Sequence, residues 1–146
     1  MNKLRYLTKS RYKEGINCPN KLFYTKKDEY PSTKMDDPFL KALAQGGFQV
    51  EELARMEYPG GHLIEGNDWN YDLIVDQTNE LLEQEEGIIY EPAFKYDNLF
   101  IRVDILVKKG DNIELIEVKS KSYDPSNEYL FVGKKGGLKG NWKPYL

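Results

Sequence analysis

The sequence predicts a mixed α/β (α+β) fold, with helices in the first half of the chain and an antiparallel meander of strands in the second. Apolar residues recur at helical spacing up to about residue 86. From residue 88 onward the pattern changes to short runs rich in Ile, Val, Leu and aromatic residues, bounded by turn residues. The length of 146 residues suits a single domain, 1–146, with a core of its own.

The first half begins with a short helix and a turn over residues 8–27. Thr8 or Ser10 is the expected N-cap, and Cys18-Pro19-Asn20 is expected to break the helix. Tyr6, Tyr12, Phe23 and Tyr24 interleave with basic residues here. They either stack nucleic-acid bases or form the apolar side of this helix, which we favour.

Two longer helical regions follow a polar loop at residues 28–37. One helix, or two, is expected from Pro38 to Pro59-Gly60-Gly61, with Gly46-Gly47 as a weak point. A further helix is expected from about Tyr71 to Glu86 with Gly87 as its C-cap. Its predicted inward residues are Leu73, Ile74, Leu81 and Leu82.

Three strands are predicted in the second half, at Ile88–Phe94, Leu99–Val107 and Ile113–Lys119. The tail from Ser120 is rich in Gly and Lys, and one more short strand is expected in it at Tyr129–Val132.

Several classes of protein are excluded by composition. No apolar run approaches the roughly 20 residues that span a bilayer, and the N-terminus lacks the apolar region of a signal peptide, so we expect a cytoplasmic protein. The single cysteine, Cys18, excludes an internal disulfide or an all-cysteine metal site, and we expect it to be buried.

The net charge of −3 hides an uneven distribution. Residues 1–27 carry eight Lys or Arg and one acid, residues 28–107 carry five basic and eighteen acidic residues, and residues 108–146 carry eight basic and five acidic. Basic flanks around an acidic middle can mark a polyanion partner.

The most informative segment is a hairpin with Gly110-Asp111 at its turn. The predicted register pairs residue 107 with 114 and 104 with 117, so Asp104 and Glu117 become cross-strand neighbours about 4.5–5.5 Å apart at Cβ. Lys119 shares the face of Glu117 because it lies two residues further along the strand. A register slip of one residue would separate the carboxylates.

Opposed carboxylates repel one another unless a cation lies between them, and Mg²⁺ is commonly held by one or two carboxylates together with phosphate and water oxygens. A lysine beside such an ion can stabilise charge on a phosphate, so Asp104, Glu117 and Lys119 have the parts for metal-assisted phosphodiester hydrolysis. Glu91 adds a third acid on the preceding strand. The alternative is a solvated charge pair on a half-exposed strand.

The pattern Asp-x12-Glu-x-Lys on adjacent strands, preceded by a helix and an acid-bearing strand, resembles the PD-(D/E)XK nuclease superfamily, especially its RecB-like branch, which includes the CRISPR-associated exonucleases. Upstream segments agree in order: LTKSRYKEGINCPNKLFY, QGGFQVEELARMEYPGG and IIYEPAF. The resemblance implies a restriction-endonuclease-like mixed sheet with an antiparallel catalytic hairpin and flanking helices. It also implies Mg²⁺ or Mn²⁺ as cofactor and DNA as substrate.

Residue by residue, the resemblance assigns Asp104, Glu117 and the main-chain carbonyl of Val118 to the metal, and Lys119 to catalysis. Glu91 matches a strand acid that supports the site in some members. A helix position that is often His in this branch falls on Glu51, which the resemblance makes a further metal ligand, with Glu52 as the neighbouring alternative.

Some features depart from the family pattern. Val103-Asp104 replaces Pro-Asp, and the helix that usually follows the Glu-x-Lys strand is missing, so we expect an N-terminal fragment of a longer protein with a further domain or a protein partner. Cys18 matches only the first of four iron–sulfur cysteines. The sequence therefore predicts a metal-dependent deoxyribonuclease, with a catalytically inactive nuclease-fold module for DNA or protein binding as the alternative.

Overall fold

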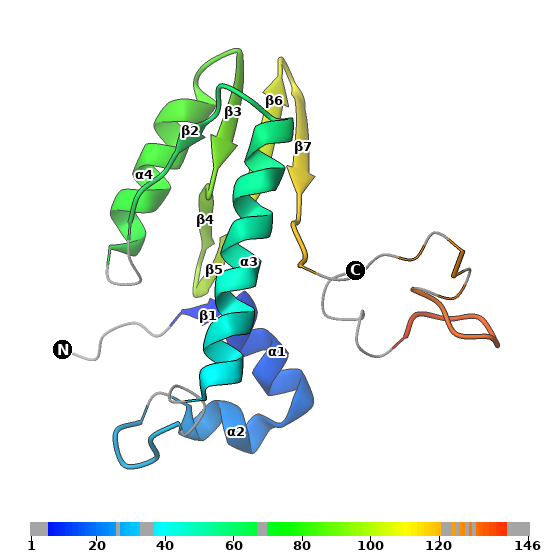
Figure 1. Cartoon of the computed structure of the whole chain (residues 1–146). Coiled ribbons are helices and arrows are strands. Elements are labelled where there is room, and N and C mark those ends of the chain that lie inside the picture. Colours follow the sequence, from blue (N-terminus) through cyan, green and yellow to red (C-terminus); the bar gives the residue numbers. More distant parts are fainter. Residues whose placement is uncertain are drawn as a thin grey trace.

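The structure is a computed structural model that describes residues 6–25, 27–32, 37–66, 70–120, 124, 126, 127, 129 and 131–139. This part of the chain forms four helices and seven strands, arranged in two mixed sheets (Figure 1), and the expected mixed α/β class is confirmed. None of its helices has the length and apolar character needed to cross a membrane.

Two short helices open the chain, α1 (Lys9–Asn17) and α2 (Pro19–Tyr24). The hydroxyl of Thr8 accepts a hydrogen bond from the backbone N–H of Arg11, so Thr8 is the N-cap. Pro19 starts the second helix at a position where its missing N–H costs nothing. The predicted break is thus confirmed, but Cys18 at the junction is exposed, and its predicted burial is wrong.

Helix α3 (Pro38–Glu57) is a single helix of 20 residues that runs through Gly46-Gly47 without a break. The carboxylate of Asp37 caps it by accepting from the N–H groups of Phe39 and Leu40, at 2.9 and 3.4 Å. A glycine in a helix interior lowers the stability of the helix by about 1 kcal/mol relative to alanine. A cost of this size does not interrupt a helix that is capped and continuous on both sides.

Helix α4 (Tyr71–Leu82) is shorter than predicted. The ammonium of Lys108 donates to the carbonyls of Leu82 and Gln84, at 2.6 and 2.8 Å. This positive charge satisfies carbonyl groups at the C-terminal end of the helix. Gly87, the predicted C-cap, instead belongs to a strand. Ile74 is buried as predicted, whereas Leu73 is 51% exposed, so its predicted inward position is wrong.

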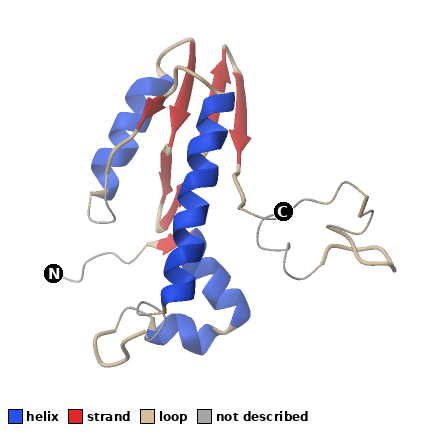
Figure 2. Ribbon diagram, viewed as in Figure 1, coloured by secondary structure: helices blue, strands red, loops and turns tan. Residues whose placement is uncertain are grey.

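A long two-stranded ribbon organises the sheets. Strands β3 (Glu86–Tyr90) and β4 (Ala93–Tyr96) follow one another along one side, and β5 (Leu99–Arg102) and β6 (Ile105–Lys109) along the other (Figure 2). The pairs Tyr90–Ile105 and Ala93–Arg102 belong to one register, so both halves form a single hairpin.

Each of the two predicted long strands is interrupted in its middle, at Glu91-Pro92 and at Val103-Asp104. Pro92 lacks the N–H that a strand ladder uses, and Glu91 has φ of +58°, in the left-handed region. Two hydrogen bonds bridge the gap: Glu91 N–H donates to the Asp104 carbonyl at 3.1 Å, and Val103 N–H donates to the Pro92 carbonyl at 3.0 Å.

Three more strands extend the ribbon sideways. Strand β7 (Asn112–Ile116) pairs antiparallel with β6, β1 (Leu7–Thr8) runs parallel to β5, and β2 (His62–Leu63) runs parallel to β3. Strand β7 stops before Glu117, three residues earlier than predicted. Strands β1 and β2 were not predicted, because two residues carry no periodicity. The predicted tail strand includes residue 130, which lies outside the described residues.

Helices α3 and α4 pack on opposite faces of the ribbon. Ile74 of α4 shares a buried cluster with Ile89 and Leu106, whereas Ala54 of α3 packs against a cluster of Tyr90, Ile105 and Val107. Neighbouring strand residues therefore alternate between the two helices. Figure 1 shows α3 across the front of the strands.

We expect the substitution Thr78→Val to lower the free energy of unfolding by about 1–3 kcal/mol, although valine is more apolar. The Thr78 hydroxyl is fully buried, accepts from Ala93 N–H at 2.9 Å and donates to the Ile74 carbonyl at 2.8 Å, and it thereby joins α4 to β4. Urea unfolding measures the change. Thr78→Ser keeps the hydroxyl and should cost less, and an equal or greater loss for Ser would contradict this role.

Candidate functional site

Three acidic residues each lie one residue beyond the end of a neighbouring strand: Glu91 follows β3, Asp104 precedes β6 and Glu117 follows β7. The register of the ribbon sets Glu91 opposite Asp104, and the register of the β6–β7 hairpin sets Glu117 opposite Asp104 on its other side. The predicted pairing of residue 107 with 114 is observed, so the hairpin register predicted from sequence is confirmed.

The Lys119 ammonium lies among oxygen atoms of the Glu117–Asp104 pair. It is in contact with the Glu117 carboxylate, donates to the carbonyl of Val118 at 2.8 Å, and lies 3.9 Å from Oδ2 of Asp104. Asp104 Oδ2 in turn accepts a hydrogen bond from the N–H of Val118 at 2.5 Å. The side chains of Asp104, Glu117 and Lys119 and the carbonyl of Val118 thus come together as predicted.

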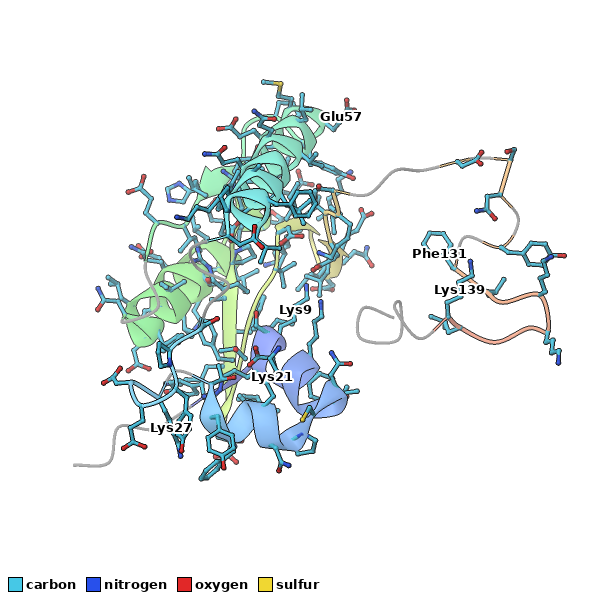
Figure 3. The ribbon with its side chains drawn as sticks, turned by 60° about the horizontal axis from the view of Figure 1, so that its bottom comes forward. Lys9, Lys21, Lys27, Glu57, Phe131 and Lys139 are labelled. Carbon is cyan, nitrogen blue, oxygen red and sulfur yellow. The ribbon has the colours of Figure 1, made fainter. Side chains whose placement is uncertain are left out.

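Lys9, from the opposite end of the chain, forms a second ion pair with Glu117. Strand β1 lies beside β5 and strand β7 beside β6, so these two short strands approach one another end to end along the same side of the ribbon. Lys9 follows β1 and Glu117 follows β7, and Figure 3 shows Lys9 between α1 and the sheet. The sequence offers no local signal for this contact, because it depends on parallel pairing of a two-residue strand.

Glu91 is held between two arginines. Its carboxylate lies 3.1 Å from a terminal nitrogen of Arg55 on α3 and 3.6 Å from Nε of Arg102 on β5. Arg102 also donates to the carbonyls of Ile64 and Gly66, at 3.2 and 3.3 Å. These contacts hold the side chain of a residue whose positive φ is otherwise unfavourable.

The C-terminal end of α3 is anchored by Tyr90, which sets the position of Arg55. The Tyr90 hydroxyl donates to the carbonyls of Arg55 and Tyr58 and accepts from the N–H of Gly61 at 3.1 Å. A Cβ on Gly61 would lie 2.3 Å from the Tyr90 ring, so this close approach requires glycine.

Glu51 faces the site and Glu52 does not. Glu51 lines a cleft of about 470 Å³ together with Arg55, Glu91, Arg102 and Asp104, whereas Glu52 is exposed. This resolves the alternative left open by the sequence, where the two adjacent glutamates are equivalent. Arg55 lies four residues after Glu51 and so on the same helix face, a spacing that points to it from sequence.

The carboxylates of Glu51 and Glu117 have opposite pKa shifts. Burial raises the pKa of Glu51, and the charges of Glu91 and Asp104 raise it further. Burial also raises the pKa of Glu117, but hydrogen bonds from Lys119 and Lys9 outweigh it, so this pKa lies below its ordinary value. At neutral pH the surroundings thus favour the charged form of Glu117 and disfavour the charged form of Glu51.

The donor set of this site suits a hard divalent cation. Carboxylate and carbonyl oxygens are the ligands that Mg²⁺ and Mn²⁺ prefer, and the Lys119 ammonium shows that Glu117, Val118 and Asp104 direct oxygens toward one positive charge. Among the residues that the structure describes, no group of three or more His, Cys, Asp or Glu side chains lies close enough to hold a metal ion. A cation here would therefore take oxygens from the backbone, from water or from a substrate as well.

Comparison with known proteins adds no identification: no family model matches the chain, and neither a curated protein nor a solved structure matches it.

We expect Glu117→Gln and Glu51→Gln to change stability in opposite directions at pH 7. Glu117 has a lowered folded-state pKa, so its charged form stabilises the fold above the ordinary pKa of Glu, and that contribution is lost as the pH falls. Glu51 has a raised folded-state pKa, so its charged form destabilises the fold at pH 7, and Glu51→Gln should raise the melting temperature.

Thermal unfolding followed by circular dichroism between pH 3 and 8 measures both effects. Both differences from the parent protein should shrink toward the acid end, where the carboxyl groups are protonated in the folded and unfolded states alike. Glu114→Gln, on the same hairpin, is the control. The same sign for both site variants at pH 7 would contradict this account of the electrostatics.

Proposed function

We propose that this protein is a metal-dependent deoxyribonuclease of the RecB-like type, which hydrolyses phosphodiesters at the Asp104–Glu117–Lys119 site. The observation that supports it most is the convergence of Asp104, Glu117 and the Val118 carbonyl on one cation, the Lys119 ammonium. The hairpin register that brings these groups together was predicted from the turn at Gly110-Asp111, independently of the family motif, and its agreement with the observed pairing supports the proposal.

In this proposal, Asp104, Glu117 and the carbonyl of Val118 would hold Mg²⁺ or Mn²⁺. Such an ion would lower the pKa of a bound water and polarise the scissile phosphate. Lys119 then contributes its positive charge to the phosphate, where negative charge develops in the transition state. The lowered pKa of Glu117 keeps it in the charged form that binds a cation.

The remaining charged residues have positioning roles. Arg55 and Arg102 hold Glu91 beside Asp104, and they place positive charge on the cleft where phosphate oxygens would lie. Glu51 lies in the same cleft, where burial and the charges of Glu91 and Asp104 raise its pKa, so it takes up a proton more readily than an ordinary glutamate.

One observation favours the second candidate, a nuclease-fold module that binds nucleic acid without cleaving it. The oxygens of Asp104 and Glu117 are already engaged by Lys119, Lys9 and the Val118 N–H. A fold in which these contacts are permanent would neutralise the carboxylates without a metal.

We expect Lys119→Ala and Glu117→Gln each to lower the rate of Mn²⁺-dependent cleavage of DNA by about 100-fold or more, since each removes a group that acts on the reacting phosphate. Cleavage of a labelled oligonucleotide measures the loss. Lys109→Ala and Glu114→Gln, on the same hairpin, are the matched controls and should retain activity. Undiminished cleavage by cleanly purified Lys119→Ala protein would refute the proposal.

Calorimetric titration with Mn²⁺ separates the two candidates. A nuclease should bind the ion in a manner that is lost in Asp104→Asn and kept in Glu114→Gln, because only the first substitution removes a ligand charge. If the parent protein and Asp104→Asn show the same absence of binding, the inactive module is the better description.

A further inference from the structure

We propose that Lys9 is a built-in counter-ion of Glu117, which withdraws when a divalent cation binds and thereby sets how tightly the site holds that cation. This inference rests on the proposed function, because it takes Glu117 as a metal ligand. Lys9 begins α1 and Glu117 follows β7, so the two charges lie 108 residues apart in the sequence. The contact therefore exists only in the folded chain.

The carboxylate of Glu117 already has two positive partners for its one negative charge. The ammonium groups of Lys9 and Lys119 both contact its Oε1 atom. A divalent ion on the same carboxylate would lie close to both ammonium groups, and like charges at short distance repel one another strongly. At least one of the two lysines then has to move away.

Lys9 is the ammonium that leaves the site at the lower cost. Lys119 also donates to the carbonyl of Val118 at 2.8 Å and lies 3.9 Å from Oδ2 of Asp104. It is only two residues from Glu117, so it stays beside the site even when its contact with that carboxylate is lost. Lys9 instead reaches the carboxylate from the N-terminal segment.

The surroundings of Lys9 permit this withdrawal without unfolding. Its backbone follows Thr8, the last residue of β1, which pairs with Phe100 of β5. The side chains of Lys9 and Glu117 are 31% and 32% exposed, so water reaches both. A lysine has a flexible four-carbon stem and a strongly hydrated ammonium. The ammonium can therefore move into water while the backbone keeps its strand pairing.

The ion pair has opposite effects on stability and on metal affinity. In the metal-free protein, the contact between Lys9 and Glu117 stabilises the fold. A cation that binds Glu117 has to replace this contact, so its affinity is lowered by the same free energy, because coupling between two partners of one site is reciprocal. The engagement of Glu117 by Lys9 is then reversible, unlike the permanent contacts of an inactive module.

The substitution Lys9→Met tests this role directly, because it removes the charge and keeps the length of the stem. We expect calorimetric titration without DNA to show about fivefold tighter binding of Mn²⁺ than in the parent protein. Without metal, the variant should melt about 1–3 °C lower by circular dichroism, and saturating Mn²⁺ should abolish this difference. Lys9→Gln should behave in the same way, whereas Lys9→Arg keeps the charge and should resemble the parent protein.

Lys21→Met is the matched control. Lys21 also belongs to the N-terminal helices (Figure 3) and pairs at 3.6 Å with Glu14, a carboxylate outside the site. Its substitution removes the same charge and should leave the affinity for Mn²⁺ unchanged. An equal gain in this control would reduce the effect to net charge and overturn the inference. Unchanged or weaker Mn²⁺ binding by the folded Lys9→Met and Lys9→Gln proteins would also overturn it.

The two proposals fail separately. If the parent protein and Lys9→Met bind Mn²⁺ equally tightly while Asp104→Asn loses binding, the metal site stands and the role of Lys9 is wrong. If Lys9→Met binds more tightly while Lys119→Ala retains cleavage, the counter-ion stands and the catalytic assignment is wrong. Absence of binding in both the parent protein and Lys9→Met would refute both proposals.

Discussion

The interruption of the ribbon at Glu91-Pro92 and Val103-Asp104 is the constraint on which the rest of the structure depends. In a regular strand, consecutive side chains point to opposite faces of the sheet. The side chains of Tyr90 and Glu91 would then lie on different faces, and so would those of Asp104 and Ile105. Here Tyr90 and Ile105 pack against α3, and Glu91 and Asp104 line the cleft beside the same helix. The two bridging backbone hydrogen bonds keep the halves in register, so apolar packing and charged groups share one face.

Charge balance is the second organising feature of the site. Four carboxylates, of Glu51, Glu91, Asp104 and Glu117, lie close to four cations, of Arg55, Arg102, Lys119 and Lys9. Carboxylates that are partly withdrawn from water need such partners, because unpaired charges there are costly. Lys9 and Lys119 come from the basic flanks, and Arg55 and Arg102 come from the acidic middle segment. Folding therefore places some of the basic residues of the flanks beside carboxylates.

The candidate site extends to the place where β1 and β7 approach one another. This arrangement brings Lys9, at the start of α1, to the end of the β6–β7 hairpin, which the order of the segments in the chain does not indicate. Helix α3 contributes less to the core than its apolar pattern suggests: it has no fully buried residue, and Phe39, Phe48 and Met56 are between 65% and 74% exposed. Its contribution is the charged pair Glu51 and Arg55, held in place through Tyr90.

The sequence by itself determined the helix-rich first half and the strand-rich second half, an N-cap at Thr8 or Ser10, the break at Pro19 and the register of the β6–β7 hairpin, because each depends on residues within a few positions of one another. Local patterns were misleading where a distant partner decided the outcome, as at the end of α4, which Lys108 satisfies in place of Gly87. Only the tertiary structure selected Glu51 over Glu52 and brought Lys9, Arg55 and Arg102 to the carboxylates. Those contacts arise from the parallel pairing of short strands and from helix packing on an interrupted ribbon, and neither leaves a periodic signal in the chain.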